Sequence, residues 1–226
     1  MQATSTSAAI LDSALTAWNA VASPFEIPPA VPIKLWQQET RTIYVENGWG
    51  PPVPYHAQCH DHGQNHGYRP VKGDREAVLA IPEVVAWPEL APLALAINDE
   101  RSPVETVGCE AHFFPNAGDE TDPCFFGSYV GLIFTDQGLN SDPKLLLAIA
   151  SHLAAAMDGC EKWWCCVELG LERLKGLPGV TLPWGLQIKV TNRGRSEQEA
   201  RKYWGHSLAR VGDAVSSLPG VDVNNT

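Results

Sequence analysis

The fold is predicted mainly from residues 103–157, which read PVETVGCEAHFFPNAGDETDPCFFGSYVGLIFTDQGLNSDPKLLLAIASHLAAAM. Two apolar runs, Val104–Phe114 and Phe125–Thr135, flank a polar loop. Side chains of like character alternate along both runs, which is the period-two pattern of β-strands. The stretch therefore predicts a β-hairpin, and the pattern that follows it predicts a helix across one face of that hairpin.

The predicted helix has a clear start and a long apolar side. Asp142 is suited to cap its N-terminus, and Pro143 suits the first helical position. Apolar side chains then recur at helical spacing at Leu146, Ile149, Ala150, Leu153 and Met157. In the preceding strand, Gly127 and Gly131 share one face, and we expect a helix to pack closely on that face.

Working outward, residues 163–175 show an apolar stripe that predicts a second helix, ended by Gly176 and Pro178. Residues 186–190 alternate as a half-buried strand. Ser196, with Glu199 three positions later, forms a capping box for a last helix that reaches Leu218. We predict an α+β fold with an antiparallel or mixed sheet, built on a central hairpin at about 104–135, with helices mainly on one face.

The chain as a whole, 1–226, is expected to form a single α+β domain. Residues 1–102 form a proline-rich, irregular N-terminal half, in which we expect a helix at 8–22, a strand or hairpin at 33–45, and short helical turns at 77–97. Residues 103–218 form the hairpin–helix–helix–strand–helix core.

Composition excludes several classes of function. The formal net charge of −10 argues against general binding to nucleic acid or to an anionic membrane. The sequence shows neither a secretory signal pattern nor an apolar stretch long enough to span a membrane, so we expect a cytoplasmic protein. Its 6 cysteines do not resemble a disulfide framework and are expected to be buried thiols.

A histidine-rich stretch is the first candidate site. YHAQCHDHGQNHGY, residues 55–68, contains the possible ligands His56, Cys59, His60, His62 and His66. Imidazole and thiolate groups are preferred ligands of zinc and other transition metals, so a bound zinc or related ion is one interpretation. No known metal-binding spacing is present, and the alternative is a polar surface loop with local hydrogen bonds.

A basic turn between a strand and a helix is the second candidate site. It comprises Arg193, Gly194, Arg195 and Ser196, and it lies in a C-terminal segment where basic residues outnumber acidic ones. Free N–H groups at the helix start and two guanidinium groups favour a small anionic ligand. The alternative is a solvated basic turn.

A third arrangement places Glu110 and His112 two residues apart on one strand face. A carboxylate beside an imidazole can orient a general base. Ser128 in the facing strand lacks the sequence context of a nucleophile elbow, so we do not predict a hydrolase triad.

Two classes of function follow. The first is a non-catalytic interaction module that recognises a protein partner or associates with itself, using aromatic and arginine side chains as anchors. The second is a small metal-dependent hydrolase or phosphoesterase in which the histidine-rich stretch activates water against an anionic substrate. Because no catalytic motif is present, we favour the interaction module.

Overall fold

The computed structural model describes residues 2–20, 31–54, 58–60, 63–115, 121–159 and 165–218, with only the backbone described at 2–5, 47, 58–60 and 63–65. The elements in chain order are α1 (Gln2–Ala20), β1 (Ile33–Gln38), β2 (Arg41–Trp49), β3 (Gln58–His60), β4 (Gly63–Asn65), α2 (Arg75–Leu79), α3 (Pro82–Ala86), η2 (Pro88–Leu90), α4 (Ala91–Ile97), β5 (Val104–Phe114), β6 (Cys124–Phe134), η3 (Gln137–Ser141), α5 (Pro143–Ala156), β7 (Cys165–Arg173), β8 (Trp184–Gly194) and α6 (Glu197–Ser216).

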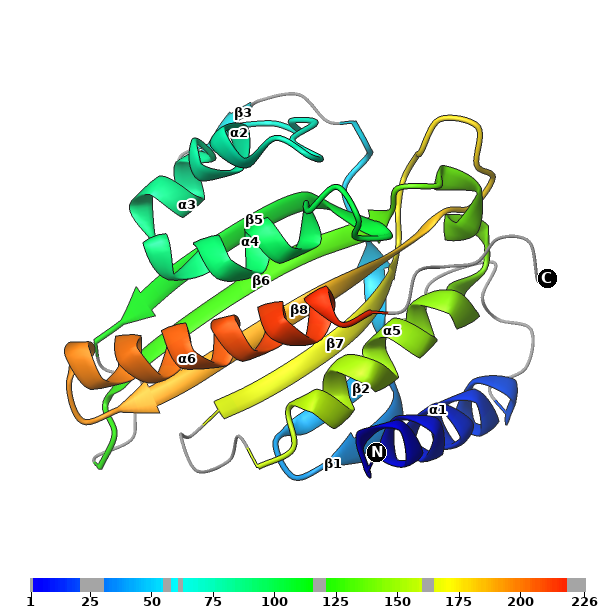
Figure 1. The fold of residues 1–226 in the computed structure, drawn as a ribbon, viewed down its shortest axis with the longest axis horizontal. Helices are drawn as coiled ribbons and strands as arrows, with labels where there is room; N and C mark the ends of the chain where they lie inside the picture. Colours follow the sequence, from blue (N-terminus) through cyan, green and yellow to red (C-terminus); the bar gives the residue numbers. More distant parts are fainter. Residues whose placement is uncertain are drawn as a thin grey trace.

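A six-stranded mixed sheet in the order β1-β2-β7-β8-β6-β5 is the centre of the fold. Only the β2–β7 pair is parallel, and the other neighbours are antiparallel. Helices α1, α5, α6 and α4 lie side by side across one face, as Figure 1 shows. The predicted α+β class is therefore confirmed, and we call the opposite side of the sheet the helix-free face.

The predicted hairpin is present as β5 and β6, which pair from Val104 opposite Phe134 to Phe114 opposite Phe125. It lies at one edge of the sheet rather than at its centre, because β5 is the last strand in the order. The central position is taken by β7 and β8, and β7 pairs with β8 along the whole length of β7.

The predicted helix at 163–175 is wrong, because its described part is strand β7. Buried side chains at Cys165, Val167, Leu169 and Leu171 recur every second residue and point into the core beneath the helices. Residues on one face of a strand are two apart, so every other one of them is four apart, which is also the spacing along one face of a helix. The same apolar residues are therefore compatible with either structure. Backbone pairing with both β2 and β8 stabilises the extended conformation, so these residues form a strand.

The helices pack on the face opposite to the one we expected from Gly127 and Gly131. Neighbouring side chains fill the space above both glycines: an added methyl group would lie 3.0 Å from the Phe125 ring at Gly127 and 3.1 Å from Val107 at Gly131. The helix-facing residues of β6 are instead Phe126, Ser128, Val130, Leu132 and Phe134, all buried. The glycines thus mark the helix-free face.

Aromatic packing fixes α6 on the sheet. Trp204 is fully buried and stacks on Phe126 with 5.2 Å between ring centroids, and Trp87 meets both rings edge-on. Ser196 caps the helix start by accepting a hydrogen bond from the Glu199 backbone N–H at 3.2 Å. The Glu199 carboxylate accepts from the backbone N–H of Arg195 at 2.8 Å, one residue before the cap, so the predicted capping box is present in a shifted form.

Helix α5 begins as the sequence predicts, with Asp142 capping and Pro143 in the first turn. At its C-terminus the buried Arg41 donates to the Ala154 carbonyl at 2.9 Å and pairs with Asp158 at 3.0 Å. Arginine is well suited to such a position because its guanidinium can satisfy helix-end carbonyls and a carboxylate together. None of the helices in the described ranges has the length and apolar character needed to cross a lipid bilayer.

Candidate functional site

The helix-free face of the sheet gathers the ionisable side chains that the core excludes. On β7 and β8 the odd and even positions point to opposite sides, so Glu168 lies opposite Lys189 and Glu172 opposite Gly185 on this face. The helix-facing positions of the same strands are almost all apolar and buried. Three zones follow one another along the strands: a covered apolar end, a polar centre and an aromatic end.

The polar centre consists of Tyr44, Glu46, Glu172, Gln187 and Lys189. The Lys189 ammonium lies 2.9 Å from Glu46 Oε2, and the Tyr44 hydroxyl donates to the same oxygen at 3.2 Å. The ammonium also sits 5.4 Å from the centroid of the Tyr44 ring. Two side chains thus share one carboxylate, which ties β2 to β8 across the intervening β7.

The pKa values of Lys189 and Tyr44 keep both groups protonated. Burial raises the pKa of the Tyr44 phenol to about 12, although Lys189 opposes this. Burial alone would lower the pKa of Lys189, but its hydrogen bonds to Tyr44 and Glu46 raise it overall. At neutral pH the pair is therefore an ammonium and a neutral phenol, which suits a structural tie better than nucleophilic or base catalysis.

Glu172 is the most unusual member of the polar centre. It is only 3% exposed, and its carboxylate accepts a hydrogen bond from the Gln187 amide at 2.9 Å. Burial raises its pKa to about 7, with Glu46 adding to the rise, whereas Lys189 and the Gln187 hydrogen bond oppose it. Glu172 therefore gains or loses its proton in the physiological range, unlike an ordinary surface carboxylate.

The covered apolar end lies next to Glu172. Val53, Val107, Ile133, Leu174 and Leu177 form a small buried cluster separate from the main core. The segment after β2 is held there by three backbone hydrogen bonds. The Gly50 N–H donates to the Arg173 carbonyl at 2.6 Å, the Val53 N–H to the Gly176 carbonyl at 3.0 Å, and the Lys175 N–H to the Pro51 carbonyl at 3.4 Å. Residues 50–54 therefore cover this end of the helix-free face, and we call them the covering segment.

The aromatic end lies at the other extreme of the same face and comprises His112, Phe114, Phe125 and Arg193. Phe114 is 48% exposed, with its ring 5.6 Å from that of Phe125. The Arg193 guanidinium lies 5.6 Å from the Phe125 centroid, and His112 is 6.1 Å from Phe114. An exposed aromatic ring beside a second ring and an arginine presents the residue types that anchor protein interfaces.

Glu110 and His112 do meet as the sequence suggests, with His112 Nε2 2.8 Å from Glu110 Oε1. Both side chains are about half exposed, so the pair is a surface contact. Ser128 points to the opposite side of the sheet, where its hydroxyl accepts a hydrogen bond from Trp204 Nε1 at 2.9 Å. The three residues are therefore not brought together, in agreement with the absence of a triad motif.

The two arginines of the predicted basic turn lie in different parts of the structure. Arg193 belongs to β8 and stacks on Phe125, whereas Arg195 is exposed in the turn that follows. Gly194 packs against the start of α6, because an added methyl group would lie 2.5 Å from the Ala200 nitrogen. Glu197 and Glu199 occupy the first helical turn, where their charges oppose an incoming anion. Anion binding at Arg193, Gly194, Arg195 and Ser196 stays a prediction from the sequence.

The histidine-rich stretch falls mostly outside what the structure describes. His56 and His62 lie outside the described residues, and for Cys59 and His60 only the backbone is described, as part of the short β3–β4 pair. His66 is half-buried. Among described side chains no three His, Cys, Asp or Glu residues are grouped to hold a metal ion. The zinc or transition-metal prediction at these residues is therefore untested.

The described cysteines are thiols, as expected, but three of the four are only partly buried. Cys109, Cys124, Cys165 and Cys166 are free, and Cys165 is buried beneath the helices. Burial raises the pKa of Cys109 to about 12 and also raises that of Cys166, so neither is a reactive thiolate at neutral pH.

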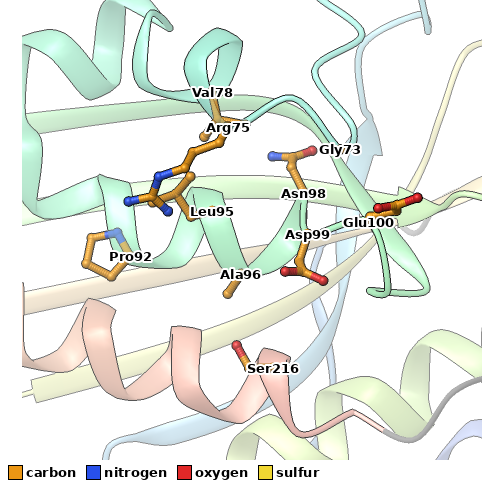
Figure 2. Close-up of a pocket in the computed structure, with 10 residues that line it drawn as sticks. All are labelled: Gly73, Arg75, Val78, Pro92, Leu95, Ala96, Asn98, Asp99, Glu100 and Ser216. Carbon is orange, nitrogen blue, oxygen red and sulfur yellow. The ribbon is translucent and has the colours of Figure 1, made fainter.

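A pocket of about 450 Å³ lies elsewhere, between α2, α4 and the end of α6 (Figure 2). Its apolar floor includes Val78 and Leu95, and its charged rim includes Arg75 and Asp99. The buried Asn98 amide in its wall already bonds to the Ala94 carbonyl and the Thr106 hydroxyl. This pocket is lined without a group poised for chemistry, and its charged rim residues are exposed.

The polar centre was not predicted from the sequence. The signal was present in β7, where Glu168, Gly170 and Glu172 alternate with buried apolar residues. A helix over that stretch would distribute these residues around its circumference, whereas the strand places them on one face of the sheet.

Comparison of the chain with protein-family models, with curated proteins and with solved structures found no match.

Proposed function

We propose that this protein is a non-catalytic interaction module that binds a protein partner carrying basic side chains, using the aromatic end of its helix-free face. The observation that carries the proposal is the exposed Phe114 ring packed beside Phe125, with Arg193 stacked on the latter. Aromatic and arginine side chains supply most of the binding energy at protein interfaces. A sheet face without covering helices presents them on a rigid base.

Charge supports a basic partner. The chain has a formal net charge of −10, which favours encounter with a positively charged surface. Glu110, at 48% side-chain exposure, adds a carboxylate beside the aromatic end. The same net charge disfavours self-association through this face, so a different protein is the better occupant.

The hydrolase alternative receives less support. It requires Arg193 and Arg195 to hold an anionic substrate together, whereas Arg193 is engaged with Phe125 and Arg195 is exposed beyond the strand. In the polar centre, Lys189 and Tyr44 keep their protons at neutral pH. The interaction module accounts for more of the observed geometry.

The test is a comparison of variants at two exposed apolar residues. Phe114→Ser alters the aromatic end, and Val85→Ser alters an exposed apolar residue on α3. Partners captured from lysate by the parent chain are identified and purified, and their affinities for all three chains are measured by calorimetry at two salt concentrations.

We expect Phe114→Ser to weaken binding by about tenfold or more, and Val85→Ser to leave it within about twofold. Affinity of the parent should also fall as salt rises, because opposite charges attract across the interface. A partner that binds Phe114→Ser as tightly as the parent, or whose affinity is insensitive to salt, would contradict the proposal.

A further inference from the structure

Glu172 and the covering segment are in direct contact. An added methyl group at Gly50 would lie 2.7 Å from Glu172 Oε2 and 3.0 Å from a Leu174 methyl carbon, so a side chain at this position would force the Glu172 carboxyl group to move. The carboxyl group is thus enclosed by the covering segment above and by β7 and β8 beside it.

The charges around Glu172 balance only when it is protonated. Among the described residues, the charged groups that act on it are Glu46 from β2 and Lys189 from β8, while Tyr44 beside them is neutral. The neighbours Val107, Ile133 and Leu174 are apolar. Glu105 of β5 lies opposite Ile133, but its electrostatic partners are Lys72 and Tyr68 rather than Glu172. Because the Lys189 ammonium already pairs with Glu46 at 2.9 Å, an ionised Glu172 would be a second carboxylate for one cation.

Burying that second carboxylate is costly unless water reaches it. Water can reach Glu172 on the helix-free face if the covering segment moves away. The covering segment is held mainly by three backbone hydrogen bonds and by Val53 in the small cluster. Such a unit can open at a lower free energy than the whole domain.

We propose that the proton on Glu172 holds residues 50–54 against the sheet, and that its loss to solvent opens this segment and exposes the covered apolar end. The device lies at the opposite end of the face from Phe114 and Phe125, and it does not depend on the proposed partner. It makes the accessible area of the helix-free face a function of pH, larger at high pH and smaller at low pH.

Amide hydrogen exchange tests this inference without a ligand. The Gly50 and Val53 amides report opening of the covering segment, and the Ile188 amide in β8 reports the sheet. After correction for the intrinsic pH dependence of exchange, we expect the opening equilibrium of the first two to rise at least tenfold between pH 5 and pH 8, with Ile188 unchanged. A constant opening equilibrium over this range would overturn the inference.

Two variants isolate the group responsible. Glu172→Gln keeps the shape and the buried contacts but cannot ionise, so the pH dependence of opening should vanish. Glu168→Gln, on the same strand and face, should retain it. If Glu172→Gln opens with the same pH dependence as the parent, the inference is refuted.

A measurement on the parent protein alone tests the inference even if the Glu172→Gln variant folds poorly. The carbon-13 chemical shift of the Glu172 carboxyl carbon in the parent protein should titrate near neutrality, in step with the exchange of Gly50 and Val53. If the Glu172 carboxyl group titrates with the ordinary pKa of a glutamate, and the covering segment opens at a different pH, then proton loss and opening are separate events and the proposal is overturned.

Discussion

The Trp204 indole N–H donates a hydrogen bond to the Ser128 hydroxyl at 2.9 Å, deep between α6 and the sheet. Both residues are buried, and the Trp204 ring stacks on Phe126 beside the bond. The contact explains two observations at once: a polar residue is tolerated on the helix-facing side of β6, and Ser128 is turned away from Glu110 and His112. The role of Ser128 in this structure is therefore to accept the buried indole hydrogen bond.

Ser128→Ala should lower the free energy of unfolding by about 1 to 3 kcal/mol, because the buried indole N–H loses its acceptor. The matched control is Ser141→Ala, whose hydroxyl bonds to the Gly138 carbonyl at an exposed site, and which should change stability by less than about 0.5 kcal/mol. Urea denaturation followed by tryptophan fluorescence measures both. Equal effects of the two substitutions would show that the Trp204 contact contributes nothing special.

Glu172 should also leave a signature in global stability. Its folded pKa of about 7 lies above the ordinary value of 4.5, so the folded state binds the proton more tightly than the unfolded chain. Its contribution is therefore complete below about pH 4.5 and is lost as pH rises towards 7. Relative to Glu172→Gln, the parent should lose about 2 to 3 kcal/mol of unfolding free energy between pH 5 and pH 8. A difference between the two proteins that does not change with pH would contradict this.

The basic turn allows the cap and the ligand to be tested apart. Ser196→Ala should cost about 1 kcal/mol of stability through the lost cap, whether or not an anion binds. Arg195→Ala should leave stability almost unchanged, because its side chain is exposed. If the turn binds phosphate, calorimetry should show several-fold weaker binding in Arg195→Ala. Equal phosphate affinity of parent and Arg195→Ala would remove the anion site from consideration.

The histidine-rich stretch yields a separate prediction. If His60, His62 and His66 bind a transition metal, zinc binding should weaken steeply below about pH 6, since neutral imidazole is the ligand. Changing His60 and His62 together to alanine should abolish zinc binding and leave the thermal unfolding temperature of the metal-free protein unchanged. Equilibrium dialysis with metal analysis measures the binding. Unaltered zinc content in the double variant would exclude these ligands.

Local structure could be predicted from the amino-acid sequence wherever one physical signal dominated. Alternation along Val104–Phe114 and Phe125–Thr135 produced the hairpin, and Asp142 with Pro143 placed the start of α5. Ser196 and Glu199 did the same for α6. These features depend on residues close together in the chain, and period and capping chemistry describe such local interactions well.

Tertiary structure decided what the local pattern left open. Apolar residues between Cys165 and Leu174 satisfy both a strand and a helical period, and only pairing with β2 and β8 selects the strand. The side of the sheet that the helices cover depends on the packing of whole elements. The prediction that a helix packs on the face of Gly127 and Gly131 was therefore wrong. The polar centre arises for the same reason, because Glu46 lies far in sequence from Glu172 and Lys189 and meets Lys189 only when β7 is placed between β2 and β8.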